Sequence, residues 1–315
     1  MPTGSNLSLK VQTPESMRRI DVLIILLLLA VLSCKHNPSP ADPVYLDALS
    51  KWKTERLEAL KTPDGWLALA GLFWLQEGEN TFGSDSSNQV IFPSIAPAKM
   101  GSFYLEGDSV RMVSEPGMGI RQAGKEGEVV RTVLTLTGED GPAVLRWHSL
   151  DWVLLERQGK YGIRLWDREN PLIRSLDSIP AFPVDPEWKV EATLIPAKKG
   201  RTVTMQNVLG MTIEQASAGV LRFEKGGKTY ELEALEDPEG FFLIFSDETS
   251  GSQTYGGGRY LYVPGVNARG KTWIDFNKSE NPPCAFTKYA TCLLPPSQNR
   301  LEVAVTAGEL AYGVH

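Results

Sequence analysis

The feature that most constrains the fold is a succession of short β-branched and aromatic runs, which fills the chain after Asp64. Glycine, proline, asparagine and aspartate interrupt these runs at close intervals, and the 29 glycines and 21 prolines supply residues for tight turns. This pattern predicts many short strands rather than helices. We therefore expect an all-β (mainly β) protein, built as a sandwich or a distorted barrel. The clearest runs read VVRTVLTLTG, WKVEATLIPA, GFFLIFSD, GRYLYVPG and KTWIDFN.

Two local signals predict individual elements. The segment EKGGKTYEL contains Gly226 and Gly227 between two alternating runs, which is typical of a hairpin with a two-residue turn. Residues 43–61 carry leucines at three- and four-residue steps, which predicts one amphipathic helix, and Asp42 is a suitable N-cap. We expect this helix to pack as a lid or an N-terminal brace.

The N-terminal segment has the pattern of a secretory signal peptide. Arg18 and Arg19 precede an uncharged apolar run at 22–32, and Ser33 and Cys34 follow it. The run is shorter than the roughly 18 residues of a comfortable membrane span, although a short transmembrane anchor remains the alternative. The letters VLSC resemble a bacterial lipobox, in which Cys34 would be lipidated and become the mature N-terminus.

The lipobox resemblance implies a location and one partner, the membrane. A lipid-modified Cys34 would anchor the protein to the cell envelope. Lys35 follows it instead of the aspartate associated with retention in the inner membrane, so we expect the outer membrane, with the protein facing the periplasm. Translation would start at Met1 or Met17.

Several longer motifs resemble one known family. They are GWLALAGLFWLQEGENTFGSD, GRYLYVPG, DFNKSENPPCAFTKYATCLLPPSQNRL and VTAGE. Together they look like the bacterial and archaeal family called domain of unknown function 1684, from about Trp52 to Glu309. The resemblance implies kinship of fold and no stated mechanism.

We expect the chain to divide as follows: a leader and signal peptide at 1–33, a flexible tether at 34–42, and a mainly β region at 43–315. That region comprises a helix at 43–62, an N-terminal β part at 63–130 and a C-terminal β part at 131–315. The run GENTFGSDSSNQVIFPSIAPAKMGSF is similar in layout to a forkhead-associated β-sandwich. Ser84 stands where that family has an arginine, so the groups that read phosphothreonine are missing.

Two cysteines, Cys284 and Cys292, lie eight positions apart near the end of the chain. In an oxidising compartment such a pair predicts a disulfide. Three alternatives stay open: a zinc site that recruits His148 and a carboxylate, a nucleophilic Cys284 behind a stiff proline pair, or two free thiols. We predict no metal and no cofactor.

His148 is the one histidine placed to serve a buried catalytic site, because His36 and His315 lie at the ends of the chain. Strand parity groups it with Leu150 and Trp152, so we expect a core histidine rather than a catalytic base. A carboxylate pair, Asp275 and Glu309, is a second candidate for acid–base work on a sugar.

A glycine-rich segment is the best candidate for ligand binding. Successive backbone N–H groups of Gly256, Gly257 and Gly258 can form an anion-holding nest, with Arg259 supplying charge. The alternative is a glycine-rich strand entry or bulge. The remaining ligand candidates are Tyr255, Asn277 and Arg300.

Two classes of function follow from these signals. A net charge of −6 without basic runs excludes nucleic acid as a partner. No complete set of nucleophile, base and orienting group emerges, so we predict a binding module for a small polar or anionic ligand or an envelope component. The alternative is a cell-envelope hydrolase that uses Asp275 and Glu309, or Cys284.

Overall fold

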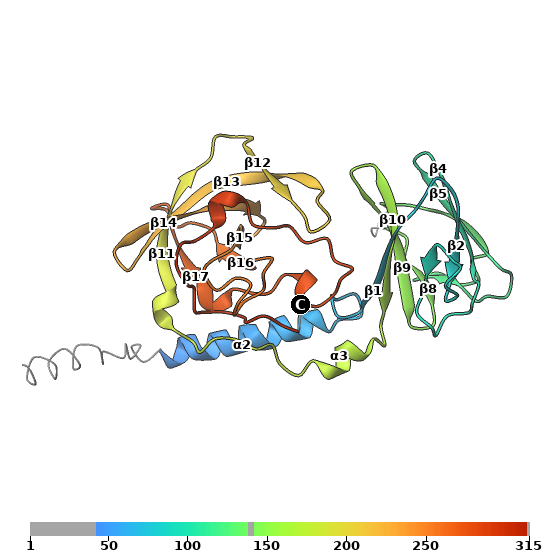
Figure 1. Cartoon of the computed structure of the whole chain (residues 1–315), viewed down its shortest axis with the longest axis horizontal. Helices are drawn as coiled ribbons and strands as arrows, with labels where there is room; N and C mark the ends of the chain where they lie inside the picture. Colours follow the sequence, from blue (N-terminus) through green and yellow to red (C-terminus); the bar gives the residue numbers. More distant parts are fainter. Residues whose placement is uncertain (1–41, 138–141, 314–315) are drawn as a thin grey trace, which may run out of the picture. The chain divides into compact units, whose positions relative to one another are not determined.

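A computed structural model describes residues 42–137 and 142–313 of the chain. The expected leader, the lipidation site at Cys34 and most of the tether lie outside the described residues. The described chain is mainly β with one long N-terminal helix, which confirms the expected fold class (Figure 1). No helix in these two ranges is both long and apolar enough to cross a membrane.

The first half of the chain forms two five-stranded sheets around one hydrophobic core. Aromatic rings fill that core, with Phe82 stacked on Phe103 at 4.5 Å between centroids and Trp152 also in contact with Phe82. The core extends to Leu165, so the first β part continues past the expected boundary at residue 130. One sheet has the order β1-β10-β9-β8-β6, with bounds Leu69–Trp74, Lys160–Asp167, Leu150–Arg157, Leu145–Trp147 and Arg121–Gln122. The other has the order β3-β2-β4-β5-β7, with bounds Val90–Ile91, Gly78–Gly83, Gly101–Glu106, Ser109–Ser114 and Arg131–Leu134.

The second half forms one strongly curved sheet with the order β16-β15-β14-β13-β11-β17, and β12 pairs with β13. The two end strands meet where the Thr272 hydroxyl donates to the carbonyl oxygen of Pro264 at 2.7 Å, so the sheet is nearly closed into a barrel. The predicted hairpin is confirmed, because Lys225 pairs with Lys228 across Gly226 and Gly227. The strands are β11 (Lys189–Pro196), β12 (Thr202–Gln206), β13 (Thr212–Lys225), β14 (Lys228–Asp237), β15 (Gly240–Phe245), β16 (Arg259–Pro264) and β17 (Lys271–Asp275).

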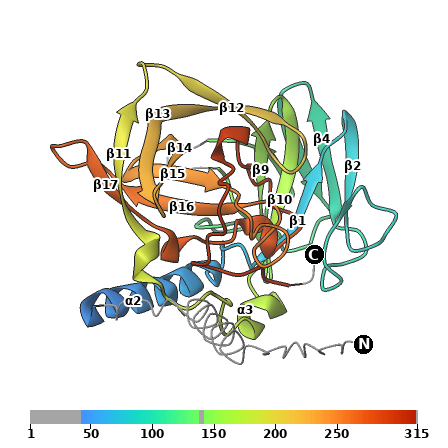
Figure 2. The same ribbon diagram turned by 60° about the vertical axis from the view of Figure 1, so that its left-hand side comes forward.

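Helix α2 (Pro43–Leu60) lies across one end of this curved sheet, beside the end of β17 (Figures 1 and 2). Asp42 caps it as predicted, because its carboxylate accepts a hydrogen bond from the Val44 N–H at 3.0 Å. Leu49 and Leu60 are its buried side chains. The short elements are α3 (Pro171–Ser175), η1 (Pro186–Trp188), η2 (Phe276–Lys278), η3 (Pro283–Ala285) and η4 (Ser297–Asn299).

His148 is not in the core, contrary to the expectation from strand parity. Trp147 pairs with Leu150, so His148 and Ser149 form the two-residue turn between β8 and β9. His148 has a left-handed φ of 49° and is exposed, with its ring 4.2 Å from that of Trp147. Alternation predicts a facing side only inside a strand, and the tight turn breaks it here.

Candidate functional site

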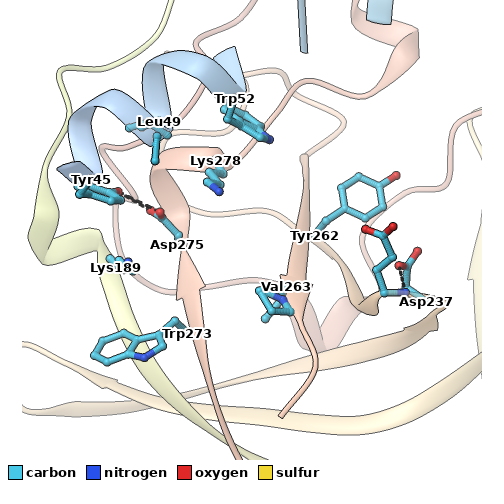
Figure 3. A pocket seen from close by; sticks show the side chains of 13 residues that line it. Tyr45, Leu49, Trp52, Lys189, Asp237, Tyr262, Val263, Trp273, Asp275 and Lys278 are labelled. Atoms are coloured by element: carbon cyan, nitrogen blue, oxygen red, sulfur yellow. Dashed lines mark hydrogen bonds between the residues drawn. The ribbon is translucent and has the colours of Figure 1, made fainter. Parts of the chain in front are cut away.

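A cleft of about 600 Å³ opens between α2 and the second sheet (Figure 3). We call it the α2 cleft. Helix α2 supplies Tyr45, Leu49 and Trp52 as one wall, while β16 and β17 supply Tyr262 and Trp273 from the sheet. Elements that are distant in sequence therefore build the cleft together.

Tyr262 and Trp273 are its most unusual components. Each is flanked along its strand by buried residues, so strand alternation turns its ring outward, away from the barrel core. Tyr262 is 54% exposed and Trp273 is 51% exposed. Within residues 42–137 and 142–313, no other Phe, Tyr or Trp side chain is exposed. Large exposed aromatic rings gathered at one site commonly mark a binding surface.

Asp275 fixes α2 against the sheet at one end of the cleft. The Tyr45 hydroxyl donates to both carboxylate oxygens of Asp275, at 2.9 and 3.0 Å (Figure 3). Burial and the neighbouring Asp275 charge raise the pKa of Tyr45, so the phenol stays protonated and remains a donor. The Asn277 side-chain amide adds a third hydrogen bond to Asp275, at 3.1 Å.

Charged groups of opposite sign occupy different parts of the cleft wall. Lys189 Nζ lies 4.8 Å from the centre of the Tyr45 ring and 6.0 Å from that of Trp273. Asp237 lies beyond Tyr262 in the wall, where its carboxylate accepts a hydrogen bond from the Glu239 N–H at 3.0 Å (Figure 3). The cleft thus combines aromatic faces with hydrogen-bonding groups of both signs, which is typical of sites for polar ligands.

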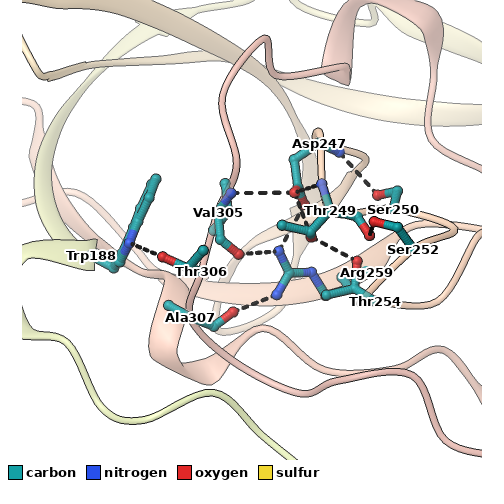
Figure 4. Close-up of polar contacts among 10 residues, drawn as sticks. All are labelled: Trp188, Asp247, Thr249, Ser250, Ser252, Thr254, Arg259, Val305, Thr306 and Ala307. Carbon is teal, nitrogen blue, oxygen red and sulfur yellow. Dashed lines mark hydrogen bonds and ion pairs between the residues drawn. The ribbon is translucent and has the colours of Figure 1, made fainter.

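Arg259, which the sequence places in a ligand-binding nest, is instead a buried structural residue. Its side chain is fully buried and its guanidinium donates to Asp247 at 2.7 Å, to the Val305 carbonyl at 2.9 Å and to the Ala307 carbonyl (Figure 4). These internal partners leave it unable to meet an anion from solvent. Gly258 has a φ of +84°, and a Cβ there would collide with the chain nearby, so the glycine serves close packing.

The two carboxylates proposed for acid–base work are not brought together. Asp275 lines the α2 cleft, whereas Glu309 lines a second cavity of about 240 Å³ along the C-terminal half of α2. Glu309 is buried there beside Arg56 and Glu280, with Arg56 Nε 3.4 Å from Glu309 and 3.2 Å from Glu280. Burial is the main cause that raises the pKa of Glu309.

The other predicted residues lie at separate places. Asn277 is buried and exchanges two hydrogen bonds with the backbone of Asp185, at 3.0 and 2.8 Å, which is a structural role. Tyr255 is half-buried and Arg300 is exposed after η4. Cys284 and Cys292 are free thiols in contact with each other. Over the described ranges, no group of three or more histidine, cysteine, aspartate or glutamate side chains is placed to hold a metal ion.

Reasoning from the sequence missed the residues that line the α2 cleft, with the exception of Asp275. The signal was present in GRYLYVPG and KTWIDFN, where Tyr262 and Trp273 occupy the positions that alternate with the core residues. A large aromatic ring on the solvent side of a strand is an unusual choice. The second signal, the partnership of Tyr45 with Asp275, spans 230 positions and has no trace in the local sequence.

Comparisons with known proteins give a family and no activity. Residues 174–310 match the family described as "Protein of unknown function (DUF1684)". Among solved structures, the chain is similar to an uncharacterised protein from Haloarcula marismortui, whose structure was solved in solution by NMR. The two share 30% sequence identity over 45% of this chain and 80% of that chain, with a TM-score of 0.37. None of the curated proteins matches this chain.

Proposed function

Through residues 174–310 the chain belongs to a family described only as of unknown function, DUF1684, and we propose that it is a binding protein whose α2 cleft holds a small saccharide. A sugar ring has an apolar C–H face and a polar hydroxyl edge. The α2 cleft offers the matching groups: the exposed faces of Tyr262 and Trp273, with lysine and carboxylate side chains beside them.

The observation that carries this proposal is the placement of Tyr262 and Trp273. Keeping two aromatic rings half in water forgoes the stabilisation that their burial would give. Both nevertheless line one cleft, on the consecutive strands β16 and β17. A ligand that covers the rings accounts for this arrangement.

The location of this binding protein belongs to the same proposal. The basic residues, apolar run and VLSC letters before residue 35 support a lipid anchor on Cys34, in the outer membrane and facing the periplasm. A saccharide ligand fits this location, because envelope glycans would be within reach.

Binding to neutral and charged oligosaccharides, screened on a glycan array and quantified by calorimetry, tests the proposal. We expect at least one saccharide to bind, and Trp273→Ala and Tyr262→Ala each to weaken that binding about tenfold, in line with about 0.5–1.5 kcal/mol per aromatic contact beyond area burial. Tyr104→Ala, in a partly exposed aromatic on β4 outside the cleft, is the matched control and should leave affinity unchanged.

Two outcomes contradict the proposal. If no saccharide binds at millimolar concentration, the ligand class is wrong. If a saccharide binds and both cleft variants behave like Tyr104→Ala, the site lies elsewhere.

A further inference from the structure

Cys284 and Cys292 are in contact with each other and do not line the α2 cleft. The Cys284 N–H donates to the sulfur of Cys292 at 3.0 Å, and the Cys292 N–H donates to the sulfur of Cys284 at 3.4 Å. Each sulfur therefore lies against the backbone of the other cysteine. This reciprocal contact keeps the two thiols within reach of each other and stabilises negative charge on either sulfur.

The two thiols differ in access to solvent. Cys284 is half-buried, at the start of a short turn after a proline pair, whereas Cys292 is only 7% exposed. A thiol-specific reagent or a disulfide can reach the first cysteine much more easily than the second. Such a difference separates an attacking thiol from a resolving thiol in redox pairs.

Their hydrogen bonds reinforce the difference. Because the Cys292 thiol donates to the sulfur of Cys284, the pKa of Cys284 is lowered and that of Cys292 is raised. Cys284 is therefore the cysteine with more thiolate character, and the thiolate is the nucleophile.

A cation without a carboxylate partner lies nearby. Arg164 stands on β10 with its guanidinium 6.0 Å from the centre of the Trp66 ring. Burial lowers the pKa of Arg164, and the neighbouring Cys292 acts in the opposite direction. Arg164 takes part in no ion pair among the described side chains, and its buried Nε has no hydrogen-bond partner among them. It is thus free to stabilise negative charge that develops on this thiol pair.

We propose that Cys284 and Cys292 form a redox-active dithiol, in which Cys284 attacks an external organic disulfide and Cys292 resolves the product. The Cys284 thiolate attacks one sulfur of the organic disulfide, whose S–S bond breaks and whose other sulfur leaves as a thiolate. Cys292 then gives up its proton and attacks the sulfur of Cys284, which releases the second external thiol. The two cysteines lose two electrons and two protons in total, and the organic disulfide is reduced to two thiols.

The test uses the full chain with Cys34→Ser, reduced and then equilibrated with oxidised and reduced glutathione at graded ratios. After acid quenching, intact mass shows each species. We expect the protein to lose two hydrogens over a defined range of glutathione ratios, and to regain them on transfer to excess reduced glutathione. In the same background, Cys292→Ala should accumulate a single stable glutathione adduct, because no resolving thiol is left. Cys284→Ala should react at least tenfold more slowly.

Each departure from this pattern overturns the proposal. Equal reaction rates of the two single variants would contradict the assignment of Cys284 as the attacking thiol and Cys292 as the resolving thiol. A dithiol that persists in a large excess of oxidised glutathione would exclude redox activity, and a bridge that native protein keeps in excess reduced glutathione would make the pair a permanent disulfide. If the variants unfold, labelling the reduced protein with substoichiometric iodoacetamide decides the roles, because the label should map to Cys284 and not to Cys292.

Discussion

Glu280 illustrates how a single residue acquires unusual chemistry from its surroundings. Its carboxyl group is largely buried and lies 3.2 Å from Arg56 Nε, and Glu309 shares the same arginine. Burial raises the pKa of Glu280 to about 7, Arg56 acts in the opposite direction, and the charge of Glu309 raises it further. One arginine cannot fully compensate two buried carboxylates, so one proton stays on the pair near neutral pH.

This shift predicts how the stability of the folded state depends on pH. The folded protein holds the Glu280 proton up to about pH 7, whereas the unfolded chain releases it near the ordinary value of 4.5. The folded state therefore binds more protons in this window, and the free energy of unfolding falls as pH rises from about 4.5 to 7. We expect Glu280→Gln to reduce this fall in the free energy of unfolding between pH 4.5 and 7, by about 3 kcal/mol at most. Urea unfolding at several pH values measures it.

An exposed carboxylate serves as the control that shows whether burial causes the pH dependence of stability. Glu231 is half exposed in its ion pair with Arg222, so Glu231→Gln should leave the slope between pH 4.5 and 7 as it is in the parent protein. The assignment to Glu280 is wrong if Glu280→Gln keeps the full slope, or if both variants lose it equally.

At the scale of elements, α2 decides whether the cleft exists. It contributes one wall, and it is held to the sheet by its buried leucines and by the hydrogen bonds from Tyr45 to Asp275. The helix has little burial along most of its length. A few contacts therefore carry the docking of the helix, and we expect the cleft to be sensitive to each of them.

Leu49 tests this dependence. Its side chain is 1% exposed and lines the cleft next to Tyr45 and Trp52. We expect Leu49→Ala to lower the free energy of unfolding by about 2–5 kcal/mol, or to release α2 alone if the helix undocks first. Urea unfolding measures the loss, and limited proteolysis detects undocking as new cleavage within residues 43–60. Leu46→Ala, at a position 39% exposed on the same helix, should change either readout little. Equal effects of the two variants would contradict this account of docking.

The predictable elements are those whose signals are local. The helix is set by Asp42 and the leucine spacing, and the hairpin by Gly226 and Gly227, so both follow from a few neighbouring residues. The prediction of a core position for His148 was wrong, because an alternation pattern does not reveal a turn of only two residues within it. Of the residues that line the α2 cleft, only Asp275 was predicted, because the wall that α2 supplies comes from a segment more than 200 positions before Asp275. The structural role of Arg259 could not be predicted either, because its partners Asp247 and Val305 lie 12 and 46 positions away and the local sequence does not show these contacts.

At the scale of the whole described chain, the main hydrophobic residues separate into two large cores with no overlap in sequence. The first draws on buried residues from Phe82 to Leu165, and the second on buried residues from Trp188 to Ala307. One smaller cluster brings together Leu60, Leu176 and Phe286, from segments before, between and within these two stretches. Since each large core is built from its own stretch of chain, a substitution that destabilises one core should change the local stability of the other core little.

Two core substitutions test this independence. Phe103 and Leu243 are both fully buried, the first in the earlier core and the second in the later one. We expect Phe103→Ala to cost about 3–5 kcal/mol and Leu243→Ala about 2–5 kcal/mol, each within its own core. Hydrogen exchange in moderate urea, read by mass spectrometry, should then show faster exchange in residues 69–167 for Phe103→Ala and in residues 189–275 for Leu243→Ala. If either variant speeds exchange equally in both spans, the two cores unfold as one cooperative unit, and the smaller cluster couples the halves more strongly than its size suggests.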